Sequence, residues 1–185
     1  MSIRKVARMG HPVLREKAKP VDPKTITSND IQSLIRDMID SMEEYGGIGI
    51  AAPQIHESRS LAIIRMDTGS KTYKDHKGEP ITVFINPTIK ILDPKKQEFW
   101  EGCLSVPGLR GLVARPRKVK ITYLDEKAEE QELTAEEFSA TVLQHELDHL
   151  MGTLYVDHIE DKTKLMFEEE YIKYHATDDT PGMDE

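Results

Sequence analysis

Residues 144–149 contain the pattern H-E-x-x-H, in which His145 and His149 stand four residues apart. On a helix this spacing places both imidazoles on one face, where they can bind a single metal ion. Glu146 then projects beside the metal, close enough to handle the proton of a bound water. The pattern therefore requires a helix at this point of the chain, and it requires further ligands from elsewhere.

The residues around this motif predict where its helix begins and ends. Thr134 and Glu137 have the spacing of a capping box, in which the two side chains satisfy N–H groups of the first turn. Gly152 predicts the end of the helix, because glycine is favoured just after the last turn. Apolar residues occupy much of the circumference, so we expect a central, buried helix. They are Phe138, Val142, Leu143, Leu147 and Leu150.

Two further helices are predicted. Residues 28–30 offer N-caps for a first helix, and Gly46 and Gly47 end it. Its apolar residues recur at helical spacing and are Ile31, Leu34, Ile35, Met38, Ile39 and Met42. A last helix is expected over residues 161–174. We therefore expect an N-terminal and a C-terminal helix in addition to the motif helix.

Apolar and alternating segments predict strands between these helices. Val119, Ile121 and Tyr123 alternate with polar residues, which indicates a half-buried strand that residues 125–128 turn back into a hairpin. The other strands or extended pieces are expected at 59–66, 81–86 (ended by Pro87), 89–92, 129–133 and 154–159. Residues 67–80 are polar and predict an exposed loop. The predicted class is α+β, with antiparallel or mixed β-sheets packed around the central helix.

Length and charge limit the class of protein. A chain of 185 residues fits one domain, which we assign to residues 1–175, followed by an acidic tail over 176–185 that we expect to be disordered. A net charge of −8 argues against nucleic-acid binding, which needs a basic surface. No apolar run is long enough to span a membrane or to form a signal peptide. We therefore expect a cytoplasmic protein without membrane or nucleic-acid partners.

The motif lacks a third ligand, since a catalytic site of this kind combines three protein ligands with one open position. The downstream candidates are His158, Glu160, Glu168, Glu169, Glu170 and His175. Glu168 belongs to a run of charges, and such runs usually form a solvated helix face. Upstream, the single cysteine, Cys103, offers a thiolate, which binds divalent transition metals strongly, and Gly102 lets the backbone approach the ion. The residues alone leave both alternatives open.

Residues 47–54 read G-I-G-I-A-A-P-Q, so that glycines alternate with isoleucines. Glycine weakens a strand interior, and one reason to keep it is the close approach of another backbone. A peptide lying along this segment as an added strand would provide such a backbone. A tight turn between the first helix and the next strand is the alternative, and glycine content alone favours the turn.

Three segments together resemble the peptide deformylase family. They are residues 47–54, residues 101–105 (E-G-C-L-S) and residues 144–149 (Q-H-E-L-D-H). An H-E-x-x-H pattern alone has a high false-positive rate, whereas all three segments in this order are specific. The resemblance implies that Cys103, His145 and His149 bind the metal, with water as the fourth ligand. In this family the metal is typically ferrous iron (Fe2+), and nickel (Ni2+), cobalt (Co2+) or zinc (Zn2+) can occupy the site.

The resemblance also implies an activity. Family members remove the formyl group from the N-terminal formylmethionine of newly made polypeptides and release formate, as metal-bound hydroxide attacks the formyl carbon. Carried over to this sequence, Glu146 is the general acid and base, and the Gln54 side chain and the Leu104 backbone N–H stabilise the oxyanion. Ile48 and Gly49 pair with the substrate backbone. The C-terminal helix resembles one that can contact the ribosome.

Three further expectations concern the surroundings of the site. The substrate methionine needs an apolar pocket, which Val142 and Phe138 can line, although core packing accounts for Phe138 equally well. Gly102 is expected to contact the substrate. An ion pair between Arg115 and Asp148 is a hypothesis, in which Asp148 helps to fix the motif helix.

Two other functions are compatible with the motif. A zinc endopeptidase would take its third ligand from a downstream glutamate such as Glu168. A structural metal site or peptide-binding module would have no turnover, but structural sites normally use four protein ligands, and the best set here supplies three.

Overall fold

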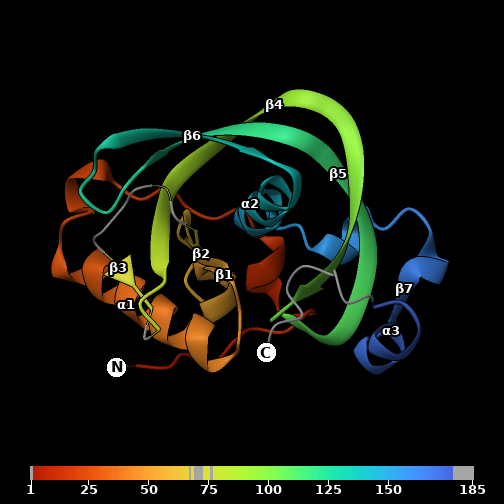
Figure 1. Ribbon diagram of the computed structural model, residues 1–185. Coiled ribbons are helices and arrows are strands. Elements are labelled where there is room, and N and C mark those ends of the chain that lie inside the picture. Colours follow the sequence, from red (N-terminus) through yellow and green to blue (C-terminus); the bar gives the residue numbers. More distant parts are fainter. Residues whose placement is uncertain (1, 67, 69–72, 76, 177–185) are drawn as a thin grey trace.

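Two long strands dominate the computed structural model, which describes residues 2–66, 68, 73–75 and 77–176. Strands β4 (Pro80–Cys103) and β5 (Val106–Leu124) curve over helix α2 (Glu137–Leu150), as Figure 1 shows. The other strands are β1 (Gly49–Ala51), β2 (Leu61–Arg65), β3 (Tyr73–Lys74), β6 (Glu130–Glu136) and β7 (Leu165–Phe167). In the described residues they form an antiparallel sheet of order β1-β2-β4-β5-β6, with β3 on β4 and β7 on β5. The predicted α+β class is confirmed.

Helix α1 (Asn29–Glu44) is the predicted first helix. All six of its predicted apolar residues are buried, and they pack against β1, β2 and the first part of β4. Burying each such side chain contributes about 1.5–3 kcal/mol, so this stripe fixes the helix on the sheet. Gly46 follows the helix with φ of +70°, a conformation that glycine adopts at low cost. The chain then enters β1, which supplies one wall of the site.

Helix α2 lies at the centre of the fold, as the sequence predicted, but its start was predicted wrongly. Ten of its residues are buried, and Leu143 and Val142 join a core cluster with β5 and β6. Thr134 was expected to cap the helix, yet it lies in β6 opposite Lys120 of β5. The helix begins only at Glu137. The ladder with β5 runs as far as the Lys118–Glu136 pair, so it holds Thr134 in the strand and delays the start of the helix.

Strand β4 replaces two separately predicted strands, 81–86 and 89–92, and extends well beyond them. Pro87 was expected to end the first of them, but the strand continues through it to Cys103. After Ile85 the described pairing of β4 is with β5 alone, and the register shifts between Ile85 and Thr88. Proline is tolerated at such bulges because no ladder hydrogen bond is lost, and the bulge also bends the strand. The bend carries Cys103 towards α2.

The C-terminal part differs most from the prediction. A helix was expected over 161–174, but residues Lys162–Lys164 form a 3-10 turn (η5), β7 follows, and helix α3 spans only Glu168–Tyr174. Residues 154–159 were expected to be extended, yet Tyr155–His158 form a 3-10 turn, η4. The other 3-10 turns are η1 (Pro12–Arg15), η2 (Pro23–Thr25) and η3 (Ala52–Ile55). Strand β7 has only three residues, which is too short for a strand pattern to be recognised in the sequence.

Two predictions fall wholly or partly outside the described residues. The tail lies there from residue 177 onward, and so do residues 67, 69–72 and 76 of the predicted 67–80 loop. Within that loop Tyr73 and Lys74 form β3, and the Tyr73 hydroxyl donates to Gln32 of α1 at 2.6 Å. Among the described helices none is both long enough and apolar enough to cross a membrane.

Candidate metal centre and its pocket

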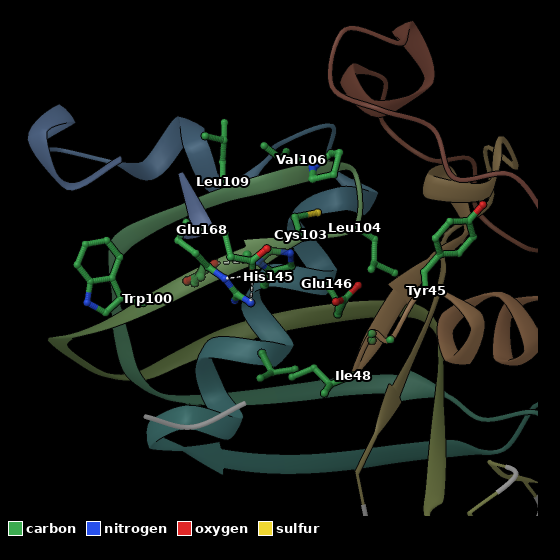
Figure 2. Close-up of a pocket in the computed structure, with 18 of the residues that line it drawn as sticks. Tyr45, Ile48, Trp100, Cys103, Leu104, Val106, Leu109, His145, Glu146 and Glu168 are labelled. Atoms are coloured by element: carbon green, nitrogen blue, oxygen red, sulfur yellow. Dashed lines mark hydrogen bonds and ion pairs between the residues drawn. The ribbon is translucent and has the colours of Figure 1, made fainter. Parts of the chain in front are cut away.

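Cys103, His145 and His149 come together from two elements that lie far apart in the sequence. Cys103 ends β4, and both histidines come from α2; Figure 2 shows Cys103 and His145 close together in the view of the pocket. One ligand atom from each residue lies within 4.8 Å of the other two, and Cys103 Sγ is 3.3 Å from His149 Nε2. Among the described residues, this is the group that could hold a metal ion, and it does not include Glu168.

The electrostatics of the cluster favour a thiolate. Burial by itself raises the pKa of the Cys103 thiol, but the charge of His149 and hydrogen bonds from both histidines outweigh it, and they hold the pKa well below its usual value. The thiolate is the form of cysteine that binds metals. The cluster therefore presents one anionic sulfur and two imidazoles.

A buried ion-pair network orients His145. Its Nδ1 lies 2.8 Å from Glu101 Oε2, which leaves Nε2 as the ring nitrogen available to a metal. Arg115 donates to Glu101 Oε2 at 3.0 Å and to Asp148 Oδ2 at 2.7 Å. His158 Nε2 lies 2.9 Å from the same Asp148 oxygen. The hypothesised Arg115–Asp148 ion pair is thus present, as part of a chain of five side chains that runs from His145 to His158.

Glu101 is a site residue that the sequence reasoning missed. It is buried, and the hydrogen bonds and charges of His145 and Arg115 lower the pKa of its carboxyl, although burial opposes them. It precedes Cys103 by two residues, which is the spacing at which side chains of a strand share a face. This two-residue spacing from Cys103 is the feature of the sequence from which Glu101 could have been identified.

We expect Arg115→Ala to weaken metal binding by about 10–100-fold, because outer partners of a ligating histidine have effects of that size. The substitution also leaves Glu101 buried without its cation, so the free energy of unfolding should fall by roughly 3–5 kcal/mol. Metal content after dialysis against a chelator, together with denaturant unfolding, measures both. The matched control is Arg117→Ala, which removes an exposed ion pair with Glu137 and should cost about 0.2–1 kcal/mol. Equal losses in the two variants would contradict the prediction.

Glu146 faces the pocket beside the cluster. Its Oε2 is buried and has no hydrogen-bond partner among the described residues. Burial raises the pKa of this carboxyl above its usual value, against the charges of His145 and His149. The position of Glu146 depends on Gly49 in β1, because a Cβ at Gly49 would lie 2.6 Å from Glu146 Oε1. The glycine that the sequence suggested for close approach of a backbone thus also makes room for a carboxylate.

We expect Gly49→Ala to lower turnover by at least about tenfold, since misplacing a catalytic group by about 1 Å can cost 10²-fold. Steady-state kinetics and metal content measure the effect, and metal content should be unchanged. Gly10→Ala is the control for backbone strain, because Gly10 has φ of +105° but an added Cβ there meets no atom within 4 Å. If Gly10→Ala lost as much turnover as Gly49→Ala, the loss in Gly49→Ala would be explained by lower stability and not by a displaced Glu146.

Gln54 lies in η3, directly after β1, so residues 47–54 combine the two predicted alternatives, a short extended piece and a turn. Its Oε1 accepts from the Ala51 N–H at 2.8 Å, which fixes the orientation of the amide. The NH₂ group therefore points the other way, 3.2 Å from Ser105 Oγ and 3.5 Å from Cys103 Sγ. The side chain presents N–H donors to the space next to the cluster.

A cavity of about 450 Å³ opens beside the metal cluster. This volume is within the usual range for a small-molecule or peptide side-chain site. The predicted substrate residues that line it are Ile48, Gly49, Gly102, Phe138 and Val142, together with Leu104. The Phe138 ring also packs edge-on against the Phe99 ring, with their centroids 5.5 Å apart. Phe138 therefore both lines the cavity and packs against a neighbouring aromatic side chain. Lining residues that the sequence reasoning missed are Trp100, Arg110 and, in this role, Glu168.

Comparison with known proteins shows what this chain is similar to. Residues 3–165 match the family described as polypeptide deformylase. A peptide deformylase of Leptospira biflexa is 40% identical over 182 residues, which is 98% of each chain. Peptide deformylase 2 of Pseudomonas syringae is 41% identical over 165 residues, covering 89% of this chain and 92% of the relative.

Solved structures agree with the sequence comparison. A class I type b peptide deformylase of Acinetobacter baumannii superposes with a TM-score of 0.77 at 34% identity, covering 86% of this chain and all of that one. A Synechococcus elongatus peptide deformylase in complex with actinonin gives 0.75 at 34% identity, over 91% and 84% of the two chains. The fold and the Cys-His-His cluster are those of a metal-binding hydrolase. The chain belongs to the peptide deformylase family and is an enzyme.

Proposed function

We propose that this enzyme removes the N-formyl group from the N-terminal formylmethionine of newly made polypeptides in the cytoplasm and releases formate. The observation that carries the proposal is the convergence of three groups on one cavity. These are the metal-ligand cluster, the unpartnered Glu146 carboxylate oxygen and the oriented amide of Gln54. The relatives are named peptide deformylases, which supports the proposed reaction. The three groups support it further, because each can perform one part of that reaction.

The residues present fit a divalent metal. Cys103, His145 and His149 offer one thiolate and two imidazoles, a donor set that suits ferrous iron and also nickel, cobalt or zinc. We propose ferrous iron as the ion in the cell. Three protein ligands with a cavity beside them leave a coordination position open, which argues against a closed structural site. A bound divalent ion would supply Lewis acidity, which lowers the pKa of water into the neutral range.

Glu146 is the proposed general base and acid. Glu146 lines the cavity, and its Oε2 has no hydrogen-bond partner among the described residues, so the carboxylate can accept the proton of a water that attacks the formyl carbon. The same oxygen can then return the proton to the departing amine, which would otherwise leave as a very poor leaving group.

The charge that develops on the formyl oxygen needs donors. Gln54 Nε2 is the first proposed donor, because the bond from Ala51 holds its amide in place before the substrate arrives. The backbone N–H of Leu104, next to the ligand Cys103, is the second. Removal of one such donor from comparable sites costs about 10²–10³-fold in kcat.

The substrate backbone is proposed to pair with residues 48 and 49. Strand β1 ends the order of the sheet, and among the described strands it pairs only with β2. Its other edge can accept a peptide as an added strand. The methionine side chain would then enter the apolar part of the cavity near Val142 and Phe138. A ribosome contact through α3 stays a proposal from the resemblance alone.

Formate release from a formyl-Met tripeptide by the iron-loaded protein tests this proposal directly. We expect formate from that peptide and no acetate from the acetyl-Met analogue. The masses of the products separate deformylation, which leaves every peptide bond of the tripeptide intact, from cleavage of an internal peptide bond, which an endopeptidase would perform. Metal-loaded protein that releases no formate would overturn the proposal.

A further inference from the structure

The C-terminal segment forms the outer wall of the pocket. Strand β7 pairs with β5 so that Met166 lies opposite Arg110, and both neighbours of Arg110 are paired as well. Tyr171 of α3 is buried and packs on Trp100 with their rings 4.9 Å apart. Trp100, Arg110 and Glu168 all line the cavity. The match to the family ends at residue 165, so most of this wall lies beyond it.

Glu168 binds Arg110, which is the one lysine or arginine that lines the described part of this cavity. Its Oε1 accepts from Arg110 Nε at 2.8 Å and from Nη2 at 2.6 Å. The guanidinium lies against Gly102, where an added Cβ would be 2.6 Å from Nη1. Figure 2 shows Glu168 among the labelled residues around the cavity, which also include Trp100 and the ligand Cys103. The ion pair is half-exposed, so a peptide leaving the cavity on this side would meet it.

We propose that Glu168 is a specificity-determining residue, which neutralises Arg110 and so sets the charge preference for the residues that follow formylmethionine. This inference rests on the proposed function, since it requires a peptide in the cavity. With the pair intact, Arg110 attracts an acidic peptide only weakly, because its charge is compensated at hydrogen-bond distance. Without Glu168 the guanidinium carries an uncompensated charge at the wall.

The test uses two amidated peptides, formyl-Met-Asp-Asp and formyl-Met-Lys-Lys, and reports the ratio of their KM values. In Glu168→Gln we expect the KM for the acidic peptide, divided by the KM for the basic peptide, to fall by roughly two- to fivefold. This is the size of effect that a partly exposed ion pair has. Arg110→Gln should move the ratio in the opposite direction, because it leaves the Glu168 carboxylate uncompensated. Both shifts should shrink at about 1 M salt, where the screening length is about 3 Å.

Glu169→Gln is the matched control, because it removes the same charge from an exposed position on the same helix. Its KM ratio should equal that of the unmodified enzyme. A Glu168→Gln ratio equal to that of Glu169→Gln would overturn the proposal. So would shifts of the same sign in Glu168→Gln and Arg110→Gln, because general damage to the wall does not depend on the sign of the charge.

Fluorescence separates this inference from the proposed function. Trp100 is the single tryptophan of the chain and lines the cavity, so its emission reports peptide binding without turnover. Peptide titrations of the three variants should reproduce the order of the KM ratios. If no peptide yields formate, the proposed function fails, and the titrations still decide whether Glu168 sets the charge preference. Identical titrations of Glu168→Gln and the unmodified protein would overturn it.

Discussion

Replacing Glu146 with glutamine is expected to lower kcat by about 10²–10⁴-fold, the usual contribution of a general acid–base group. Glutamine has nearly the same shape as glutamate but cannot accept the proton of the attacking water. The side chain is buried and lies against Gly49, and its Oε2 has no hydrogen-bond partner among the described residues. Folding should therefore survive the exchange. The measurement is single-turnover formate release by protein whose metal content has been matched.

The control for this prediction is Glu137→Gln, at the exposed start of the same helix. It removes the same charge from α2 without reaching the cavity, and its kcat should remain within about twofold of the unmodified value, as for ordinary surface substitutions. A Glu146→Gln enzyme with normal kcat and full metal content would show that another group moves the proton.

Removal of the thiolate is the second large effect. We expect Cys103→Ala to lose more than about 100-fold in metal affinity, which exceeds the effect of substituting an outer partner of a ligand. The unmodified protein should be stabilised by about 2.7 kcal/mol when free metal is at 100 times its dissociation constant. In Cys103→Ala that stabilisation should vanish at the same metal concentration. Thermal unfolding with and without added metal measures it independently of turnover.

Glu168→Gln is the comparison that distinguishes the competing ligand sets. If a downstream glutamate completed the site, as in the endopeptidase alternative, this variant would lose the metal and Cys103→Ala would retain it. We expect the reverse, because Glu168 bonds Arg110 whereas Cys103 Sγ lies 3.3 Å from His149 Nε2. Metal retention by Cys103→Ala would overturn the ligand assignment.

Local patterns predicted the parts of the fold that local physics decides. The apolar stripe of α1 and the helix carrying His145 and His149 follow from periodicity, and both are present. The ligand group of Cys103 with the two histidines was reached through the resemblance, because no periodic pattern links residues 42 or more positions apart. Resemblance therefore supplied the long-range information that a single sequence does not express.

The errors occur where long-range pairing overrides a local signal. Thr134 has the chemistry of an N-cap, but ladder bonds to β5 hold it in a strand. Pro87 is a common strand end, but a bulge accommodates it. The wall residues Arg110 and Glu168 are 58 positions apart, and only the pairing of β7 with β5 brings them together. A run of three glutamates gave no sign that one of them faces the cavity.

The irregular course of β4 also affects how the molecule avoids association. Among the described residues, this strand pairs only with β5 after Ile85, and Ile89, Ile91 and Leu92 are exposed in this stretch. An exposed, apolar strand edge is a template for pairing with a second chain. Pro87 and Pro94 lack an N–H to donate, and the register shifts around Asp93 interrupt any straight run of pairing groups. The bends that bring Cys103 over α2 thus also discourage edge-to-edge aggregation.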